Sequence, residues 1–400
     1  MGFPDGFWWG TAASSVQAEG APAGSTWREW EELGNAPPSG DGNGFATRYG
    51  EDFALFAAHG LTHHRLSLEW ARLEPRRGQH AGEAVEHYRD VLQTGRDAGL
   101  TMWACLHHFS LPGWFADDEG GFLDDRARSG IWQRHVAWCA ETFGDLVDGW
   151  KPINEPMVYA AGGWRSGWLP PGRQDPGDYR KVLRSMHLAH RDAWRELRGG
   201  GAPVATVHAM APIQRMAETD RAFRVTRSAE QAMWTVPIRA HREGILSVPG
   251  LAEEEVPDLQ GSADLFGFSY YSAWGIAEDG SIVPYPPDAR VGPMGYAPWS
   301  EGLGVVLHRL DEELPDTPLL IAEHGVGTDD DRWRGDTLRD SLAQVEEAIG
   351  DGVDVRGFFH WTGVDNYEWT YGFTVPFGLF NRDREAKPSA ELLASYTNLR

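Results

Sequence analysis

The stretch Trp150-Lys-Pro-Ile-Asn-Glu-Pro156 is a short strand-like run that ends in polar residues and a proline, where a loop begins. The stretch Leu319-Leu-Ile-Ala-Glu-His-Gly325 repeats this pattern later in the chain. Each run places one glutamate, Glu155 or Glu323, where the strand gives way to the loop. The C-terminal ends of parallel strands in a barrel share one rim, so we expect both carboxylates to project from the same end of the fold.

Strand-like runs of similar length recur along the whole chain. Longer segments with helical periodicity separate them, and this alternation is typical of strand-helix units. We count eight such runs: 7–13, 63–69, 102–107, 149–154, 204–208, 265–270, 319–323 and 355–361.

The segments between these runs predict helices. Phe53, Phe56 and Ala57, for example, follow the i, i+3, i+4 spacing of a helix with one apolar face. The predicted helices are 49–59, 83–98, 129–143, 178–197, 217–242, 301–314 and 334–349.

Eight alternating units predict an α/β fold, a (β/α)8 TIM barrel with its active site at the C-terminal ends of the strands. Side chains suited to chemistry fall at or just after predicted strand ends: His108, Glu155, Tyr271, Glu323 and Trp361. Two carboxylates that face one pocket are typical of acid/base and nucleophilic work on a glycosidic bond.

Length and composition agree with one domain over residues 1–400. The Gly/Pro-rich stretches 35–44 and 284–298 are short and carry aromatic or hydrophobic residues, which indicates ordered loops rather than linkers. Acidic residues outnumber basic ones 59 to 36, and the net charge is −23. This balance argues against a nucleic-acid partner, because phosphate binding needs a basic face.

The start of the chain and its cysteines predict a cytosolic protein. Met1 leads directly into the segment 3–10 without a basic stretch and an apolar stretch after it, so we expect no secretory leader. No apolar run approaches the roughly 18 residues of a membrane span. Cys105 falls in a predicted strand and Cys139 on a predicted helix, so we expect two buried free thiols rather than a disulfide.

Motifs spread along nearly the whole chain resemble those of one known family. They are the opening segment 7–20 (FWWGTAASSVQAEG), 64–70 (HRLSLEW), 154–156 (NEP), 321–325 (IAEHG) and 361–369 (WTGVDNYEW). In this order they are similar to glycoside hydrolase family 1, the β-glucosidase type.

This resemblance implies a retaining β-glycosidase, most simply a β-glucosidase, that acts on a small-molecule β-glycoside without a cofactor. Glu323 would be the nucleophile and Glu155 the general acid and then base, with carboxyl groups about 5 to 5.5 Å apart. The resemblance places Arg65 and Tyr271 beside Glu323, where a cation and a phenol favour the carboxylate. The negative charge of Glu323 would raise the pKa of Glu155.

The resemblance also implies how the sugar is held. Trp361 would form the floor under its apolar face. A hydrogen bond to the sugar 2-hydroxyl, which strengthens in the transition state, would come from Asn154. The further sugar-binding residues would be Gln17, His108, Glu368 and Trp369.

Glu368 separates two branches of the family. Members that act on 6-phosphorylated sugars usually carry a small hydroxyl residue there, because a glutamate would repel the phosphate. The chain has the glutamate. We therefore expect an unphosphorylated sugar.

Several positions depart from the family pattern: Phe109, Ser269, Ala322 and His324. Serine at position 269 lacks the amide of the usual asparagine, so we expect a lost hydrogen bond near Glu323 or Glu155, with effects on rate and substrate preference. The chain is also shorter than a typical member, so we expect a more open leaving-group side that admits a bulky aglycone.

Other functions stay open from the sequence. A transglycosylase could use the same two glutamates, and a sugar-binding barrel without catalysis would typically have lost one of them. A metal-dependent barrel hydrolase would need His-x-His at the end of the first strand, where the chain has Ser14-Ser-Val-Gln17. His187 and His190 lack a matching carboxylate or cysteine cluster, so we expect no metal. The natural aglycone and the oligomeric state stay open.

Overall fold

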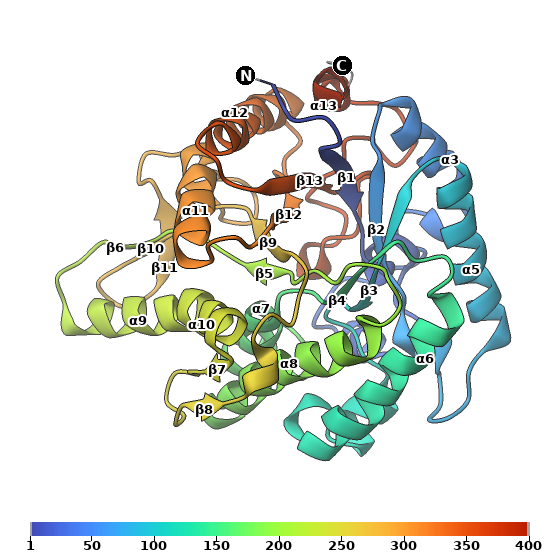
Figure 1. Cartoon of the computed structure of the whole chain (residues 1–400), viewed down its shortest axis with the longest axis horizontal. Helices are drawn as coiled ribbons and strands as arrows, with labels where there is room; N and C mark the ends of the chain where they lie inside the picture. Colours follow the sequence, from blue (N-terminus) through green and yellow to red (C-terminus); the bar gives the residue numbers. More distant parts are fainter. Residues whose placement is uncertain (1, 398–400) are drawn as a thin grey trace.

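The computed structural model describes residues 2–397, in which eight parallel strands form a ring with helices around it (Figure 1). Neighbours in the ring follow the order β4-β3-β2-β1-β13-β12-β9-β5. The predicted barrel is confirmed. Its strands are β1 (Trp8–Ala12), β2 (His63–Ser67), β3 (Thr101–His107), β4 (Gly149–Ile153), β5 (His208–Ala209), β9 (Phe266–Tyr270), β12 (Leu319–His324) and β13 (Val355–Trp361).

The ring closes between β4 and the chain that leads into β5. The predicted strand 204–208 is only partly regular: isolated bridges join Trp150 to Val204 and Ala205 to Leu265. Trp150 both donates to and accepts from this neighbouring chain. The next β4 residue that faces it, Pro152, has no N–H to donate, so the ladder is interrupted there.

The outer helices lie close to the predicted segments (Figure 1). The predicted helix 217–242 starts later, because Thr219 caps it by accepting from the Ala222 amide at 3.1 Å, and a wider turn divides it. The large helices are α3 (Phe45–Ala58), α5 (Gly82–Asp97), α6 (Gln133–Phe143), α8 (Pro176–Leu197), α9 (Asp220–Glu230), α10 (Val236–Glu243), α11 (Ser300–Glu313), α12 (Asp331–Gly350) and α13 (Pro388–Thr397).

Shorter elements decorate the barrel. The α-helical ones are α1 (Ser15–Glu19), α2 (Thr26–Glu32), α4 (Trp70–Leu73) and α7 (Pro156–Ala161). The 3-10 and π turns are η1 (Trp114–Asp118), η2 (Gly121–Leu123), η3 (Ala127–Trp132), η4 (Gly162–Ser166), η5 (Gln231–Thr235), η6 (Pro257–Leu259) and η7 (Trp369–Tyr371). Two small sheets comprise β6 (Ile213–Arg215) with β10 (Ala273–Ile276) and β11 (Ile282–Tyr285), and β7 (Ile245–Leu246) with β8 (Glu254–Glu255).

The inside of the ring is filled with side chains. Trp103, Leu320 and Phe359 belong to this inner cluster, while a larger apolar cluster lies between strands and helices. Lys151 enters the inner cluster, with Nζ 3.5 Å from the Phe359 ring centroid and the side chain fully buried. Burial lowers its pKa well below the usual value, so the barrel centre carries an amine with weakened affinity for a proton.

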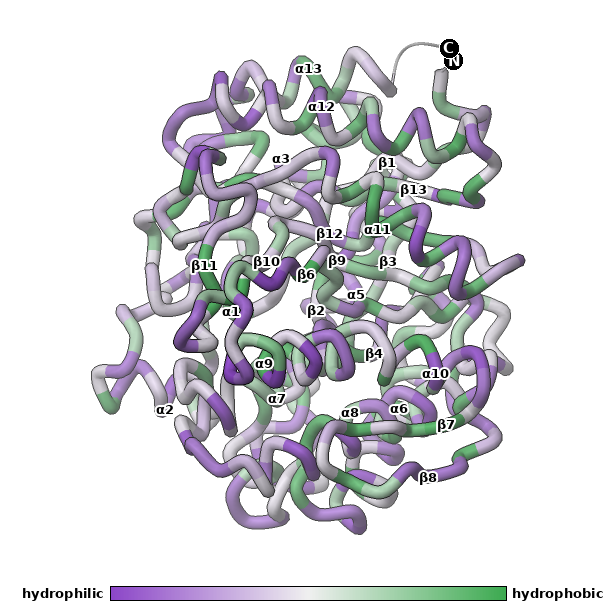
Figure 2. The backbone as a smooth tube through the Cα atoms, turned by 90° about the vertical axis from the view of Figure 1, so that its left-hand side faces the viewer, coloured by the Kyte–Doolittle hydropathy of each residue, from purple (hydrophilic) through white to green (hydrophobic). Residues whose placement is uncertain are grey.

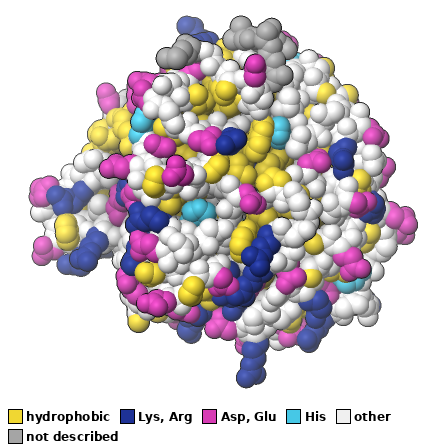
Figure 3. Space-filling view, viewed as in Figure 1, with side chains coloured by type: hydrophobic (Ala, Val, Ile, Leu, Met, Phe, Trp, Pro, Cys, Tyr) yellow, Lys and Arg dark blue, Asp and Glu magenta, His cyan; other side chains and the backbone are white. Residues whose placement is uncertain are grey.

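The two ends of the chain lie side by side, as the ring contact of Phe3 with Tyr396 at 6.0 Å shows (Figure 2). On the face in Figure 3, acidic side chains are spread over the surface with lysines and arginines among them. Cys105 and Cys139 are buried free thiols, as predicted. Within residues 2–397, no helix combines the length and the apolar character needed to cross a membrane.

Candidate active site

Glu155 lies directly after β4, at the residue that precedes helix α7. Its backbone is left-handed, with φ of 43°, and Pro156 starts the helix with its φ already suited to it. The Glu155 amide donates to Val207 O at 2.9 Å, which ties the residue to the next part of the ring. The Ser269 hydroxyl donates to Glu155 Oε1. Glu155 is therefore held in place through both its backbone amide and its side-chain carboxyl.

Glu323 reaches the same space from β12 through a local irregularity. Leu320 points into the ring and Ile321 points out toward the helices. Strict alternation would turn Glu323 outward, but the register shifts between Ile321 and Glu323, as a β-bulge does. Glu323 then accepts hydrogen bonds from Arg65, in a buried ion pair, and from Tyr271 at 2.8 Å.

The two carboxyl groups differ in their surroundings. Burial, followed by the charge of Glu323, raises the pKa of Glu155 to about 8, while the Ser269 hydrogen bond acts in the opposite direction. Glu323 has a guanidinium and a phenol as partners. Glu155 is therefore neutral at pH 7, and Glu323 has the partners of an ionised group.

Arg65 connects several of the predicted residues. It is fully buried on β2 and donates to Asn154 Oδ1 at 3.2 Å and to His108 Nδ1 at 2.9 Å, besides its bond to Glu323. Burial lowers the pKa of His108 well below its usual value. The neutral ring accepts at Nδ1, so its proton is on Nε2, which lies 3.5 Å from Asn154 Nδ2 on a side chain that lines the cavity.

Gln17 and Glu368 form a second polar group. Gln17 Nε2 donates to Glu368 Oε2 at 3.0 Å, and Asn366 Nδ2 donates to the same oxygen at 3.1 Å. Ser14 fixes the amide orientation of Gln17 by donating to its Oε1 at 2.7 Å. Burial raises the pKa of Glu368 to about 7. Glu368 also lines the cavity described below, where its carboxyl can meet a sugar hydroxyl.

Aromatic rings surround these polar groups. The rings of His108 and Trp361 are stacked with centroids 5.6 Å apart, and those of His108 and Trp369 with centroids 5.9 Å apart. Trp27 packs edge-on against Trp369 at 4.6 Å. Trp361 and Trp369 are thereby held as flat walls, which suit the apolar face of a sugar.

One cavity of about 740 Å³ joins these parts. We call the first part of its wall the polar end, made of His108, Glu155, Tyr271, Glu323, Trp361, Glu368 and Trp369. The apolar end consists of side chains from elements outside the ring, among them Met157, Val225, Met233, Trp274, Ile276 and Val283.

The structure brings the ten predicted site residues together around this cavity. Seven of them line it, while Arg65 and Asn154 are joined to that lining by hydrogen bonds, as Gln17 is to Glu368. Asn366, Trp27 and the residues of the apolar end were not expected from the sequence. Asn366 stood inside a recognised motif, whereas the others carry no local signal.

At position 269, the effect of the departure from the family pattern differs from the expected one. The smaller Ser269 was expected to lose a hydrogen bond, but its hydroxyl donates directly to Glu155. His324 bridges the Tyr270 carbonyl at 2.7 Å and the Ser341 hydroxyl at 2.9 Å, outside the ring. Phe109 has φ of 67° and its ring lies 5.5 Å from that of Trp369, and Ala322 is fully buried.

The chemistry of the site rests on oxygen and nitrogen groups of the chain. Among residues 2–397, no three histidine, cysteine or acidic side chains gather into a group that could hold a metal ion. His187 stacks on His208 with centroids 5.5 Å apart, and burial lowers the pKa of His187 to about 3. These histidines are packed, neutral rings.

Comparison with known proteins agrees with this geometry. A curated relative, the coniferin beta-glucosidase of Pinus contorta, is 28% identical over 453 residues, covering 95% of this chain and 88% of the relative. Beta-glucosidase A of Thermotoga maritima is 27% identical over 421 residues, covering 94% and 92%. The solved beta-glycosidase from Pyrococcus horikoshii superposes with a TM-score of 0.90 at 29% identity, covering 99% of this chain and 95% of that one.

The family model for "Glycosyl hydrolase family 1" matches residues 1–395, nearly the whole chain. The motifs, the barrel and the paired carboxyl groups all lie within this match. The chain belongs to glycosyl hydrolase family 1.

Proposed function

We propose that the protein is a retaining β-glucosidase that acts on unphosphorylated β-glucosides, with Glu323 as nucleophile and Glu155 as acid and base. One observation carries the assignment: two carboxyl groups share one cavity, and their surroundings favour opposite protonation states. Such a pair can perform the two half-reactions of retaining hydrolysis.

In the first step Glu323 attacks the anomeric carbon. The bond from that carbon to the leaving oxygen breaks, and neutral Glu155 gives its proton to that oxygen, so the aglycone leaves as an alcohol. Ser269 already donates to Oε1 of Glu155, which leaves Oε2 to carry the proton. Arg65 and Tyr271 hold the Glu323 carboxylate in place for the attack.

In the second step the surroundings of Glu155 change. The ester on Glu323 carries no negative charge, so the largest electrostatic cause that raises the pKa of Glu155 disappears. Glu155 is then a carboxylate and takes a proton from water, whose oxygen attacks the anomeric carbon and releases Glu323. The sugar leaves with its original configuration.

The polar end supports glucose as the sugar. Gln17 and Asn366 hold Glu368, and Arg65 holds Asn154 and His108, so donors and acceptors for sugar hydroxyls are set before a ligand arrives. The carboxyl of Glu368 also opposes a 6-phosphate. The named β-glucosidase activities of the curated relatives support the same substrate class.

The test follows hydrolysis of 4-nitrophenyl β-glucoside by proton NMR. We expect β-glucose as the first product, followed by slow mutarotation. Glu323→Ala should lose hydrolysis, and added azide should restore nitrophenol release with α-glucosyl azide as the product, because azide takes the place of the missing carboxylate. α-Glucose as the first product would contradict the proposal.

The 6-phosphate of the same aryl glucoside tests the sugar assignment. We expect cleavage of the unphosphorylated compound at a higher kcat/KM, because the Glu368 carboxyl at the polar end would repel a phosphate. Faster cleavage of the phosphorylated compound would contradict this part of the proposal.

A further inference from the structure

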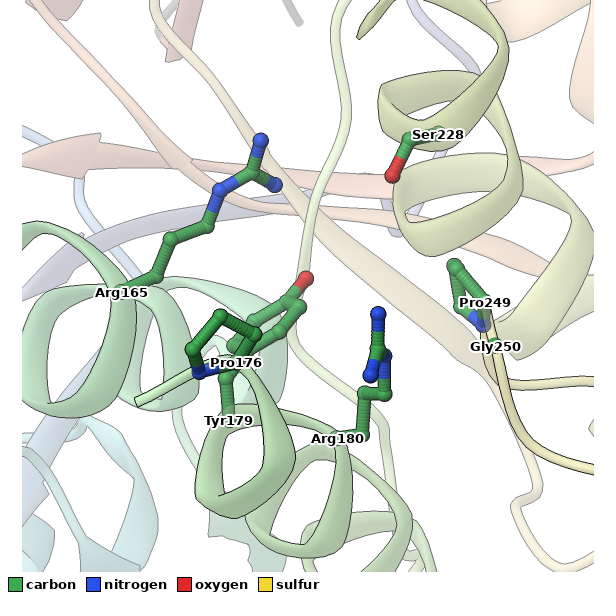
Figure 4. A pocket seen from close by; sticks show the side chains of 7 residues that line it. All are labelled: Arg165, Pro176, Tyr179, Arg180, Ser228, Pro249 and Gly250. Carbon is green, nitrogen blue, oxygen red and sulfur yellow. The ribbon is translucent and has the colours of Figure 1, made fainter. Parts of the chain in front are cut away.

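A second cavity of about 400 Å³ is lined by the seven residues that Figure 4 shows. Arg165 and Tyr179 line both cavities, so the two adjoin at these side chains. The remaining lining residues come from α8, α9 and the loop after β7: Pro176, Arg180, Ser228, Pro249 and Gly250.

Two guanidinium groups give this second cavity its chemistry. The Arg165 side chain extends from η4 and the Arg180 side chain from α8 (Figure 4). The Arg165 guanidinium lies 5.7 Å from the centroid of the Tyr179 ring. Within residues 2–397, neither arginine has a carboxylate within 4.0 Å, although Arg173, Lys181 and Arg184 nearby each have one.

Two observations indicate that both cations act on this space. The charges of Arg165 and Arg180 each lower the pKa of the Tyr179 phenol, against the burial that raises it overall. Gly250, with φ of 81°, leaves room for Arg180: a Cβ there would lie 2.6 Å from its Nε. In a chain with a net charge of −23, two uncompensated guanidinium groups at one cavity form a local site for a negative charge.

The order of the polar end, the apolar wall and the cationic cavity defines the chemical layout of a matching ligand. The sugar is held at the polar end, and the wall that follows is apolar, with Met157, Val225 and Met233 among its side chains. Beyond the shared wall of Arg165 and Tyr179 comes the cationic cavity. A neutral sugar aglycone would leave this apolar wall and both cations without matching partners.

We propose that the second cavity is a subsite for an anionic group, a carboxylate or a sulfate, at the far end of an apolar aglycone. Arg165 and Arg180 bind the anion through their N–H groups, and the Tyr179 and Ser228 hydroxyls are further donors that line the same cavity. The inference rests on the proposed glucosidase function, because the sugar fixes the other end of the ligand.

The experiment compares biphenyl-4-yl β-glucosides that carry a carboxylate, a sulfonate or a neutral carboxamide at position 4′. We expect kcat/KM for an anionic compound to exceed that for the carboxamide by about five- to tenfold, mainly through KM. Because the arginines are partly exposed, the advantage should fall as salt rises. The anion with the higher kcat/KM distinguishes a carboxylated aglycone from a sulfated one.

The variant that carries both Arg165→Gln and Arg180→Gln should bring this ratio close to one. Arg198→Gln is the control for the loss of a positive charge on this helix: it removes one charge at the other end of α8, where Arg198 lies over the Trp194 ring, and should leave the ratio unchanged. Equal kcat/KM for acid and carboxamide in the wild type, or a ratio that survives the double substitution, would overturn the inference.

The neutral compounds separate this inference from the proposed function. If 4-nitrophenyl β-glucoside is cleaved but none of the biphenyl glucosides is, the cavity does not accept such a body, and the inference fails while the glucosidase function stands. If none of the β-glucosides is cleaved, the proposed function fails, and the inference fails with it.

Discussion

The polar end and the apolar end of the cavity are built from different parts of the molecule. Glu155, Glu323 and Trp361 stand at or next to the ends of ring strands, where neighbouring strands fix their positions. Val225 and Ile276 belong to α9 and β10, which lie outside the ring. The reaction is thus assigned to the most constrained part of the barrel, and selectivity to elements that can vary without disturbing it.

The two ends also differ in how their side chains are held. At the polar end a single side chain, that of Arg65, contacts Glu323, Asn154 and His108. A substitution of Arg65 therefore disturbs several groups at once. At the apolar end the contacts are dispersive, and methionines such as Met157 and Met233 adapt to different shapes. Substitutions should therefore cost far more at the first end than at the second.

The largest effect is expected from Glu323→Gln at the polar end. The neutral amide keeps the shape of the side chain but cannot form the ester, so kcat should fall on the order of 10⁵-fold. Steady-state assays with 4-nitrophenyl β-glucoside measure the loss, and circular dichroism checks that the barrel is intact. A loss of less than about 100-fold would remove Glu323 from the role of nucleophile.

Arg65→Met should have the largest effect on stability. It leaves the buried Glu323 carboxylate without its cation, which costs about 3 to 5 kcal/mol in the free energy of unfolding. Arg309→Met is the control, because Arg309 pairs with Glu230 in a partly exposed position, where the cost is about 1 kcal/mol or less. Urea denaturation measures both. Equal costs would contradict the difference between a buried and an exposed pair.

A third, smaller effect concerns pH and Glu155. Its pKa in the folded protein, about 8, lies above the ordinary value of 4.5. The folded state therefore binds this proton more tightly, so the stability from this group is present below pH 4.5 and is lost as pH rises to 8. Glu155→Gln should remove this loss, so its stability relative to the wild type should rise by about 1.4 kcal/mol per pH unit between pH 5 and pH 8 and level off at higher pH.

Urea denaturation of both proteins between pH 5 and pH 9 measures that change. The wild type should also lose kcat/KM above about pH 8, where the free enzyme gives up the acid proton. A stability difference that is constant over this range would contradict a raised pKa for Glu155.

The smallest effect is expected at the apolar end. Val225→Ala removes two methyl groups from α9, so kcat/KM for the neutral biphenyl glucoside should fall about two- to fivefold relative to that for methyl β-glucoside. The ratio of the two kcat/KM values isolates the effect on aglycone selectivity, because an effect on the glycosidic cleavage itself changes both values alike. A loss that is equal for both glucosides would show that α9 acts on the reaction and not on the aglycone.

The sequence predicted the ring because its strands are short, evenly spaced and followed by polar residues. The positions of Glu155 and Glu323 at strand ends follow from that spacing alone. The groups that surround them, such as Arg65 and Gln17, were expected from resemblance, and the structure places them beside the two carboxyl groups or Glu368.

Other features could not be predicted because they depend on residues far apart in the chain. The bulge that turns Glu323 inward arises from the register of β12 against both neighbours. Ser269 contacts Glu155 across 114 positions of sequence. The second cavity combines η4, α8 and α9, and no local pattern shows that Arg165 and Arg180 share a wall.

The ring is joined between β4 and Val204 by an isolated bridge, and Pro152 cannot add the next hydrogen bond. This junction lies beside Glu155, while Glu323 stands on a different strand. If the junction opens, the outer helices persist but the two carboxyl groups lose their fixed separation. We then expect activity to be lost on heating before the barrel unfolds as a whole, so that one strand junction sets the thermal tolerance of activity.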